Sequence, residues 1–236
     1  MIPLIRTMEK EIRRFLTLEK ESVSELVVDR SRFIAHSFSV TSQEMIREKV
    51  HQIQSLYPDA NHWCYAWRLG YNPSLEFSTD SGEPHGTAGR PILGSILQRN
   101  LTNLLVIVSR YFGGKKLGVR GLINAYQQVA DIVLESSGIT EMELFAEFFL
   151  TINPACFQLM VNQLICFCRD KKYLELNPNE SKIRFRVPIH RLGEAFTLLE
   201  LKKKEKCLLN WKRCDNQLDM NRKITSFSYS APDLPF

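Results

Sequence analysis

The chain has 236 residues, of which 44% are hydrophobic and 24% are charged, and its formal net charge at pH 7 is +5. This composition is ordinary for a globular protein, and the length suits one large domain or two small ones with buried cores. No apolar run is long enough to span a membrane, and the N-terminus lacks the apolar core of a signal peptide. The six cysteines show no disulfide-scaffold density, so we expect a cytoplasmic protein with reduced thiols and no membrane partner.

The first part of the chain is predicted to contain strands and one helix after a polar lead-in over residues 1–22. Two strands joined by a tight polar turn are expected within 25–40, because apolar triplets flank that turn. A helix should follow to about residue 56, since Thr41 and Ser42 offer N-cap chemistry and Pro58 ends the apolar periodicity. Further strands are predicted over residues 62–69 and 75–78.

The next segment is predicted to complete the first domain, over residues 23–138. Residues 91–97 should form a helix with Pro91 in its first turn. Residues 104–108 are continuously apolar, which is typical of a strand buried on both faces. A long helix over 122–134 should end at Gly138, where we place the domain boundary.

Residues 141–236 are predicted to form a second, ferredoxin-like domain, so the expected fold class is α+β. A strand at 144–152, a helix at 154–169, a hairpin at 173–187 and a helix at 192–204 give the order β-α-β-β-α. A closing strand is expected near residues 224–229. The open face of such a sheet would suit a protein partner.

Most of the eleven glycines lie in two runs that flank the apolar segment at 104–108. Clustered glycine indicates positive φ angles or a close approach of the backbone, so we expect the two runs to form one surface. Between residues 82 and 121 there is one acid, Glu83, against six arginines and lysines. The motif glycines are Gly82, Gly86, Gly89, Gly113, Gly114, Gly118 and Gly121.

This surface is a candidate site for an anion or a nucleic acid. Lys115, Lys116 and Arg120 lie on a glycine loop before a helix N-terminus, where their charge and the helix dipole both attract anions. Arg110, Tyr111 and Phe112 could stack on a nucleic-acid strand, although Phe112 could equally fill the core. The candidate binding residues are Arg90, Arg110, Tyr111, Lys115, Lys116 and Arg120.

An enzymatic alternative places acid–base chemistry or a phosphate contact in a pocket between the loops, on Asp80, Glu83, Thr87 and His62. Each of these residues also has a structural interpretation. Asp80 and Thr87 would hold the turn, Glu83 would pair with Arg90 or Arg110, and His62 would be a hydrogen-bonded strand residue. Neither glycine run has the spacing of a nucleotide-binding motif, so we expect no cofactor and no metal, and an enzyme is the less favoured interpretation.

These residues also resemble the Impact family, which is also called the YigZ family. The resemblance rests on A-x-H-x-C-x-A at 60–66, D-x-G-E-P-x-G-T-A-G-x-P-x-L at 80–93, and R-Y-F-G-G-x-K-L-G followed by G-L-x-x-A-Y at 110–126. It covers about residues 22–135. It implies a first domain like the second domain of a small-subunit ribosomal protein, followed by a ferredoxin-like domain similar to domain V of elongation factor G.

The resemblance also implies a function, because paired domains of this kind in elongation factor G bind the ribosome. We therefore expect RNA or ribosome binding and a role in translation or its regulation. Eukaryotic relatives reach a signalling partner through an additional N-terminal domain for which this chain has no room, so that partnership is not carried over. Ser81 replaces a frequent second acid and disfavours a two-carboxylate metal site, whereas Arg120 replaces a frequent glycine and adds charge. A hydrolase or phosphotransferase and a protein-interaction module are the alternatives.

Overall fold

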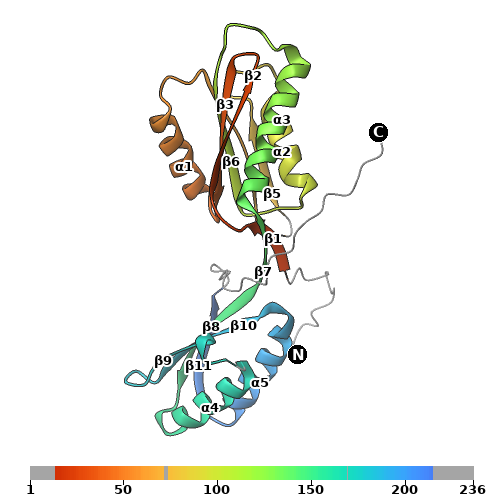
Figure 1. Cartoon of the computed structure of the whole chain (residues 1–236). Coiled ribbons are helices and arrows are strands. Elements are labelled where there is room, and N and C mark those ends of the chain that lie inside the picture. The colour runs from red at the N-terminus through yellow and green to blue at the C-terminus, as the bar shows by residue number, and fades with distance from the viewer. Residues whose placement is uncertain (1–13, 72–73, 169, 215–236) are drawn as a thin grey trace, which may run out of the picture. The chain divides into compact units, whose positions relative to one another are not determined.

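The computed structural model describes residues 14–71, 74–168 and 170–214, and the chain divides into two compact units. One unit spans Phe15–Met142, and the second begins at Glu143 (Figure 1). Each unit has a hydrophobic core of its own, so each is described by itself. Within the described residues, no helix combines the length and the apolar character that crossing a membrane requires.

The first unit is built on a five-stranded antiparallel sheet with the strand order β2-β3-β6-β4-β5. Helices α2 and α3 pack on one face of this sheet and α1 packs on the other (Figure 1). The central strand β6 is buried on both faces, as its continuous apolar run predicts. The elements are β2 (Ser22–Val28), β3 (Ser31–Ser39), α1 (Gln43–Leu56), β4 (His62–Leu69), β5 (Leu75–Thr79), α2 (Gly89–Gln98), β6 (Leu104–Tyr111) and α3 (Gly118–Ser137).

The ends of the helices follow the local sequence signals. The Ser42 hydroxyl accepts the backbone N–H of Met45 at 3.3 Å, which satisfies a donor that the first turn of α1 cannot use itself. Gly138 follows α3 with a φ of 67°, a conformation that favours glycine. A further pair of strands was not expected. Strand β1 (Arg14–Leu18) pairs with β7 (Ile139–Glu143), so part of the expected lead-in is a strand.

The second unit has a four-stranded antiparallel sheet with the order β11-β8-β10-β9 and two helices on one face. With the chain order β-α-β-β-α-β, this is the ferredoxin-like topology that the sequence predicts. Short 3-10 turns η1 (Pro154–Cys156), η2 (Lys171–Tyr173) and η3 (Ile189–Arg191) connect these elements. The elements are β8 (Phe145–Ile152), α4 (Phe157–Cys168), β9 (Leu174–Asn177), β10 (Lys182–Pro188), α5 (Leu192–Lys204) and β11 (Leu208–Cys214).

The fourth strand of this sheet lies earlier in the chain than expected. Residues 224–229, the expected position, are outside the described residues, whereas β11 pairs with β8 along the edge of the sheet. The sequence signal of β11 is weak because only one of its faces contacts the core. Leu208 and Trp211 belong to the core cluster, but Leu209 and Lys212 are exposed.

Candidate functional site

The two glycine runs lie where neighbouring backbones approach closely. A Cβ atom at Gly89 would lie 2.7 Å from the backbone nitrogen of Thr79, and a Cβ atom at Gly113 would overlap the backbone of Arg30. A side chain at either position would therefore force the loops apart. Four other motif glycines have φ angles between 71° and 89°, namely Gly82, Gly86, Gly114 and Gly118.

Asp80 holds the first glycine run together. Its Oδ2 accepts the N–H of Gly86 at 2.8 Å, and its Oδ1 accepts those of Ala88 at 3.0 Å and Gly89 at 2.9 Å. Burial by itself raises the pKa of this carboxyl, but the three N–H donors outweigh it and the net pKa is lowered. Asp80 is thus an ionised cap of the loop and of the first turn of α2.

A buried ion pair joins the first run to the end of β6. Arg110 Nη1 lies 2.5 Å from Glu83 Oε1, and the two side chains are only 6% and 3% exposed. The hydroxyl of Tyr126 on α3 donates to the same carboxylate oxygen at 2.8 Å. Arg110 Nη2 donates to the Ser31 hydroxyl at 3.4 Å, while its Nε–H is buried without a partner among the described residues.

This pair shows how Arg110, a candidate nucleic-acid contact, is held in the structure. Its guanidinium is buried and is neutralised by Glu83, because β3 and β4 flank β6 at this point and exclude solvent. The register places Phe33 and His62 opposite Arg110 on the two neighbouring strands. Of the two arginine partners considered for Glu83, the structure therefore selects Arg110.

Cys64 lies in the same buried network. Its thiol donates to the backbone carbonyl of Asp80 at 2.9 Å. Burial raises the pKa of Cys64 to about 12, so the thiol stays neutral near pH 7 and is a poor nucleophile. Burial also raises the pKa of Tyr126, which keeps its hydroxyl protonated and able to donate to Glu83.

A cavity of about 490 Å³ opens beside the ion pair, and we call it the α3 cavity. Its floor is formed by buried Glu83 and Arg110 together with half-buried His62. Its volume falls within the range of about 300–1,000 Å³ that is usual for ligand sites. The other lining residues are Asn61, Pro84, Phe112, Lys116, Leu117, Gly118, Val119 and Leu122.

His62 lines this cavity and is held by the first glycine run. Its Nδ1 lies 3.0 Å from the carbonyl oxygen of Ser81. A carbonyl oxygen can only accept, so Nδ1 carries the hydrogen of the neutral ring and Nε2 carries the lone pair. Nε2 lies 3.9 Å from Glu83 Oε1.

The four residues of the enzymatic alternative do not all line the α3 cavity. His62 and Glu83 line the α3 cavity, but Asp80 and Thr87 do not. The Thr87 side chain is used by its own loop, because its hydroxyl donates to the carbonyl oxygen of Pro84 at 2.7 Å and the residue is 1% exposed. Asp80 and Thr87 therefore follow their structural interpretation.

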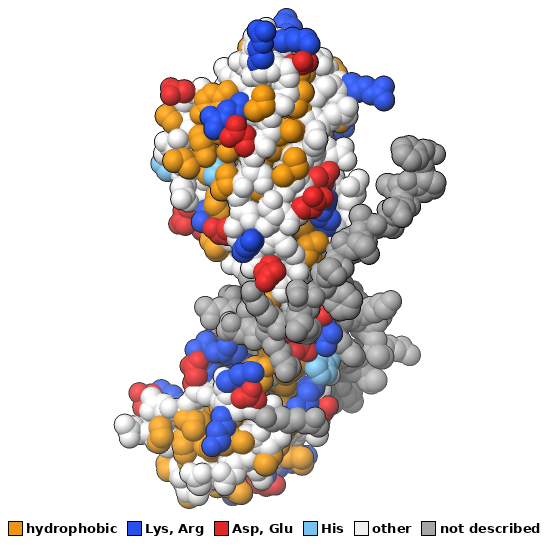
Figure 2. All heavy atoms as spheres, viewed as in Figure 1, with side chains coloured by type: hydrophobic (Ala, Val, Ile, Leu, Met, Phe, Trp, Pro, Cys, Tyr) orange, Lys and Arg blue, Asp and Glu red, His pale blue; other side chains and the backbone are white. Residues whose placement is uncertain are grey.

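Exposed cations lie along the loop into α3 and in its first turn, and one of them, Lys116, lines the α3 cavity. Lys115, Lys116 and Arg120 are all exposed, and Lys115 pairs with Asp29 at 3.0 Å. No side chain caps the N-terminus of α3, and its first turn contains no acid. Figure 2 shows Lys and Arg side chains gathered at the end of the unit that carries the β2–β3 turn and the loop into α3.

The remaining candidates differ in exposure. Arg90, in the first turn of α2, is exposed, whereas Tyr111 is half-buried with the Arg32 guanidinium 6.0 Å from its ring centroid. Phe112 is 46% exposed, so it does not fill the core at the end of β6.

Two polar residues of the site were not among the candidates from sequence. Tyr126 was expected only as a buried residue of α3, yet its hydroxyl supports Glu83. Asn61 was not singled out, and its Oδ1 accepts the N–H of Phe112 at 2.7 Å. The G-L-x-x-A-Y segment carried a signal for Tyr126, but Asn61 is identified only by the register of β4 on β6.

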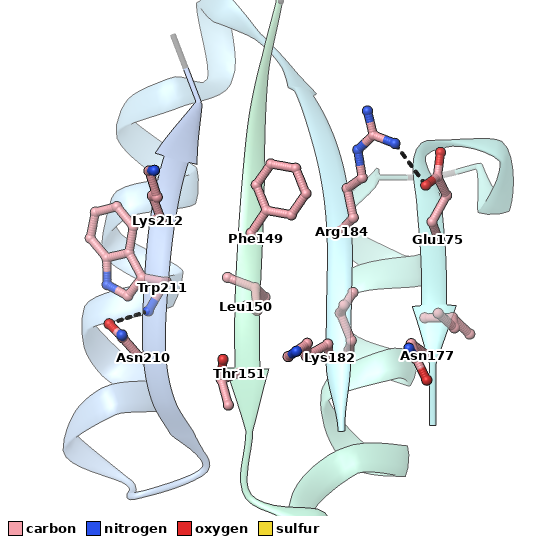
Figure 3. A pocket seen from close by; sticks show the side chains of 12 residues that line it. Phe149, Leu150, Thr151, Glu175, Asn177, Lys182, Arg184, Asn210, Trp211 and Lys212 are labelled. Atoms are coloured by element: carbon pink, nitrogen blue, oxygen red, sulfur yellow. Dashed lines mark hydrogen bonds and ion pairs between the residues drawn. The ribbon is translucent and has the colours of Figure 1, made fainter. Parts of the chain in front are cut away.

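The second unit carries a hollow of the same volume, about 490 Å³, on the open face of its sheet. One row of side chains crosses the four strands as Lys212, Phe149, Arg184 and Glu175 (Figure 3). Phe149 is 42% exposed, and Arg184 Nη1 donates to Glu175 at 2.9 Å. This face is the location expected for a protein partner.

Comparison with known proteins concerns mainly the first unit. Residues 29–134 match the Impact N-terminal domain. IMPACT family member YvyE of Bacillus subtilis is 35% identical over 133 residues, which cover 56% of this chain and 61% of that protein. IMPACT family member YigZ of Escherichia coli is 37% identical over 102 residues, which cover 42% of this chain and 50% of that protein.

The matched region thus spans between 50% and 61% of the length of these two relatives. A crystal structure described as that of a hypothetical protein superposes with a TM-score of 0.62 and covers 86% of this chain and 97% of that one. Its sequence identity is 22%, so this likeness concerns the fold alone.

Proposed function

Since the chain belongs to the IMPACT family through the Impact N-terminal domain at residues 29–134, we propose that it is a cytoplasmic RNA- or ribosome-binding protein that acts in translation or its regulation. The observation that carries the proposal is the set of three exposed cations, Lys115, Lys116 and Arg120, at the uncapped N-terminus of a 20-residue helix. The translational role rests on the resemblance of the two predicted domains to domains that bind the ribosome.

The physical basis is the attraction of this helix end for phosphate. The first N–H groups of a helix have no acceptor within it, and the aligned peptide dipoles place partial positive charge there. In α3 no acidic side chain of the first turn competes for these groups. The exposed Lys115–Asp29 pair is no obstacle, because surface ion pairs contribute only about 0–1 kcal/mol and exchange readily.

The proposal is tested with a variant that replaces Lys115, Lys116 and Arg120 by Gln. We expect its affinity for RNA to fall and the dependence of log K on log salt concentration to become shallower by about 2, since each phosphate contact on a single strand contributes about 0.7. The measurement is fluorescence anisotropy of labelled RNA over a series of salt concentrations.

The matched control removes three exposed lysines from the second unit by replacing Lys203, Lys204 and Lys206 with Gln. It lowers the net charge by the same amount. The comparison therefore separates binding at a local site from the attraction of RNA to the overall positive charge of the protein. An unchanged affinity and salt dependence in the first variant, or an equal loss in both variants, would contradict the proposal.

A further inference from the structure

The walls of the α3 cavity combine apolar surface with one accessible aromatic ring. Pro84, Leu117 and Leu122 line it, and Phe112 and Val119 are 46% and 61% exposed at the same place. Large apolar side chains that stay exposed around a hollow commonly mark a site for a ligand or partner. The Arg110 guanidinium lies 5.6 Å from the centroid of the Phe112 ring, so a flat group would lie against the part of the ring that the guanidinium leaves free.

The floor of the same cavity offers directional hydrogen bonds. The Arg110 side chain is more than nine-tenths buried, and its Nε–H has no partner among the described residues. Buried donors are nearly always satisfied, so this unpartnered N–H of a cavity-lining residue is a candidate donor to a bound ligand. His62, which pairs with Arg110 in the register of β4 on β6, lines the same cavity, and its Nδ1 is held by the Ser81 carbonyl oxygen.

The mouth of the cavity favours an anion. Gly118 and Val119, at the N-terminus of α3, line it together with Lys116. Phosphate is the anion that a helix N-terminus and an adjacent lysine commonly hold. The ligand should therefore carry a phosphate at one end and a flat ring with hydrogen-bonding edges at the other.

We propose that the α3 cavity receives one nucleotide of a single-stranded RNA. The base lies against Phe112 with an edge toward His62 and Arg110, and its phosphate lies at the N-terminus of α3 beside Lys116. A base within a duplex cannot enter, because its edge is paired and its faces are stacked. This inference rests on the RNA binding proposed above and adds to it a preference for unpaired strands.

The test compares a single-stranded RNA with a duplex of the same sequence, again by fluorescence anisotropy. In Phe112→Ala, we expect single-strand affinity to fall about tenfold, a typical effect of removing an aromatic stacking partner, while duplex affinity stays unchanged. Phe77→Ala is the matched control, since Phe77 lies on β5 in the same unit, is 44% exposed and does not line the cavity. It should change neither affinity.

An unchanged single-strand affinity in Phe112→Ala, or an equal loss for both RNAs, would overturn the inference. Titration with free nucleoside 5′-monophosphates distinguishes a nucleotide within an RNA strand from a free nucleotide as the ligand of the cavity. Phe112-dependent binding of the monophosphates combined with Phe112-independent RNA binding would also overturn it, in favour of a free-nucleotide site. The Lys115, Lys116 and Arg120 variant reports separately on the proposed function, because its effect on duplex binding does not require the cavity.

Discussion

The α3 cavity and the open sheet face of the second unit enclose the same volume, yet their charged groups are held differently. In the α3 cavity, the Arg110 and Glu83 side chains are 6% and 3% exposed, and a strand end and a glycine loop bring them together. On the sheet face, Arg184 and Glu175 are 30% and 54% exposed and stand side by side on regular strands (Figure 3), and Arg184 also pairs with Glu147, which is 2% exposed.

This contrast shows that the volume of a hollow does not identify a binding site. A buried charge is retained only where its partners are fixed, and the same fixed partners give a ligand a defined set of donors and acceptors. Exposed pairs on a sheet are screened by water and can rearrange. The α3 cavity therefore has the properties of a specific site, whereas the sheet face offers a broader and more adaptable surface.

The largest expected effect is on the free energy of unfolding, when the arginine of each ion pair is replaced in turn. Arg110→Met should lower the free energy of unfolding by about 3–5 kcal/mol, because it leaves the buried Glu83 carboxylate without its counter-charge. Arg184→Met should cost less than Arg110→Met, because Arg186 Nε lies 3.6 Å from the buried Glu147 carboxylate and supplies a second counter-charge, and because Glu175 is exposed.

Urea unfolding, monitored by tryptophan fluorescence, checks this pair of variants. Trp63 and Trp67 lie in the first unit and Trp211 lies in the second. When the tryptophans of one unit are replaced, the remaining fluorescence reports on the unfolding of the other unit. Equal losses for the two arginines would mean that burial does not distinguish the two regions.

The second effect concerns Asp80, which shapes the loop beside the α3 cavity. Asp80→Asn should destabilise the first unit by roughly 2 kcal/mol near pH 7, because hydrogen bonds to a charged acceptor are stronger than those to an amide. The pKa of Asp80 is lowered in the folded state, so its stabilisation is complete above the unfolded value of about 3.9 and is lost as the pH falls through the lower folded value.

Unfolding free energies measured over a pH series check this sign. The difference between the wild type and Asp80→Asn should shrink as the solution becomes more acidic than the ordinary carboxyl pKa. Asp59→Asn is the matched control, because it makes the same change at an exposed aspartate of the first unit. A difference that grows toward acid pH would show that the carboxylate does not stabilise the loop.

The sequence predicted most helices and strands because their signals are local. The apolar run of β6, the Ser42 cap and Gly138 each act within a few residues, so they could be read without knowing the fold. Strand β11 was misplaced because its pattern is only half apolar, and β1 was missed because it is short and pairs with distant β7.

The candidate site was only partly predictable, for a related reason. The glycine runs located it, since their spacing and composition are visible in the sequence. The burial of Arg110 was not visible, because it depends on β3 and β4 flanking β6 in one particular register. The same register places Asn61 and His62 beside the end of β6. The polar groups that line the cavity therefore depend on the pairing of strands that are distant in the sequence.

The smallest expected effect is on RNA binding by the sheet face. Phe149→Ala should leave the affinity for single-stranded RNA within about twofold, although Phe149 is exposed to nearly the same extent as Phe112. Stacking on a base needs phosphate contacts beside the ring, and here Arg184 is held by Glu175 and Glu147, whose carboxylates also repel phosphate. The anisotropy measurement used for Phe112→Ala checks this directly. A loss as large as that of Phe112→Ala would mean that exposure of an aromatic ring, and not the buried donors and the helix end behind it, decides where RNA binds.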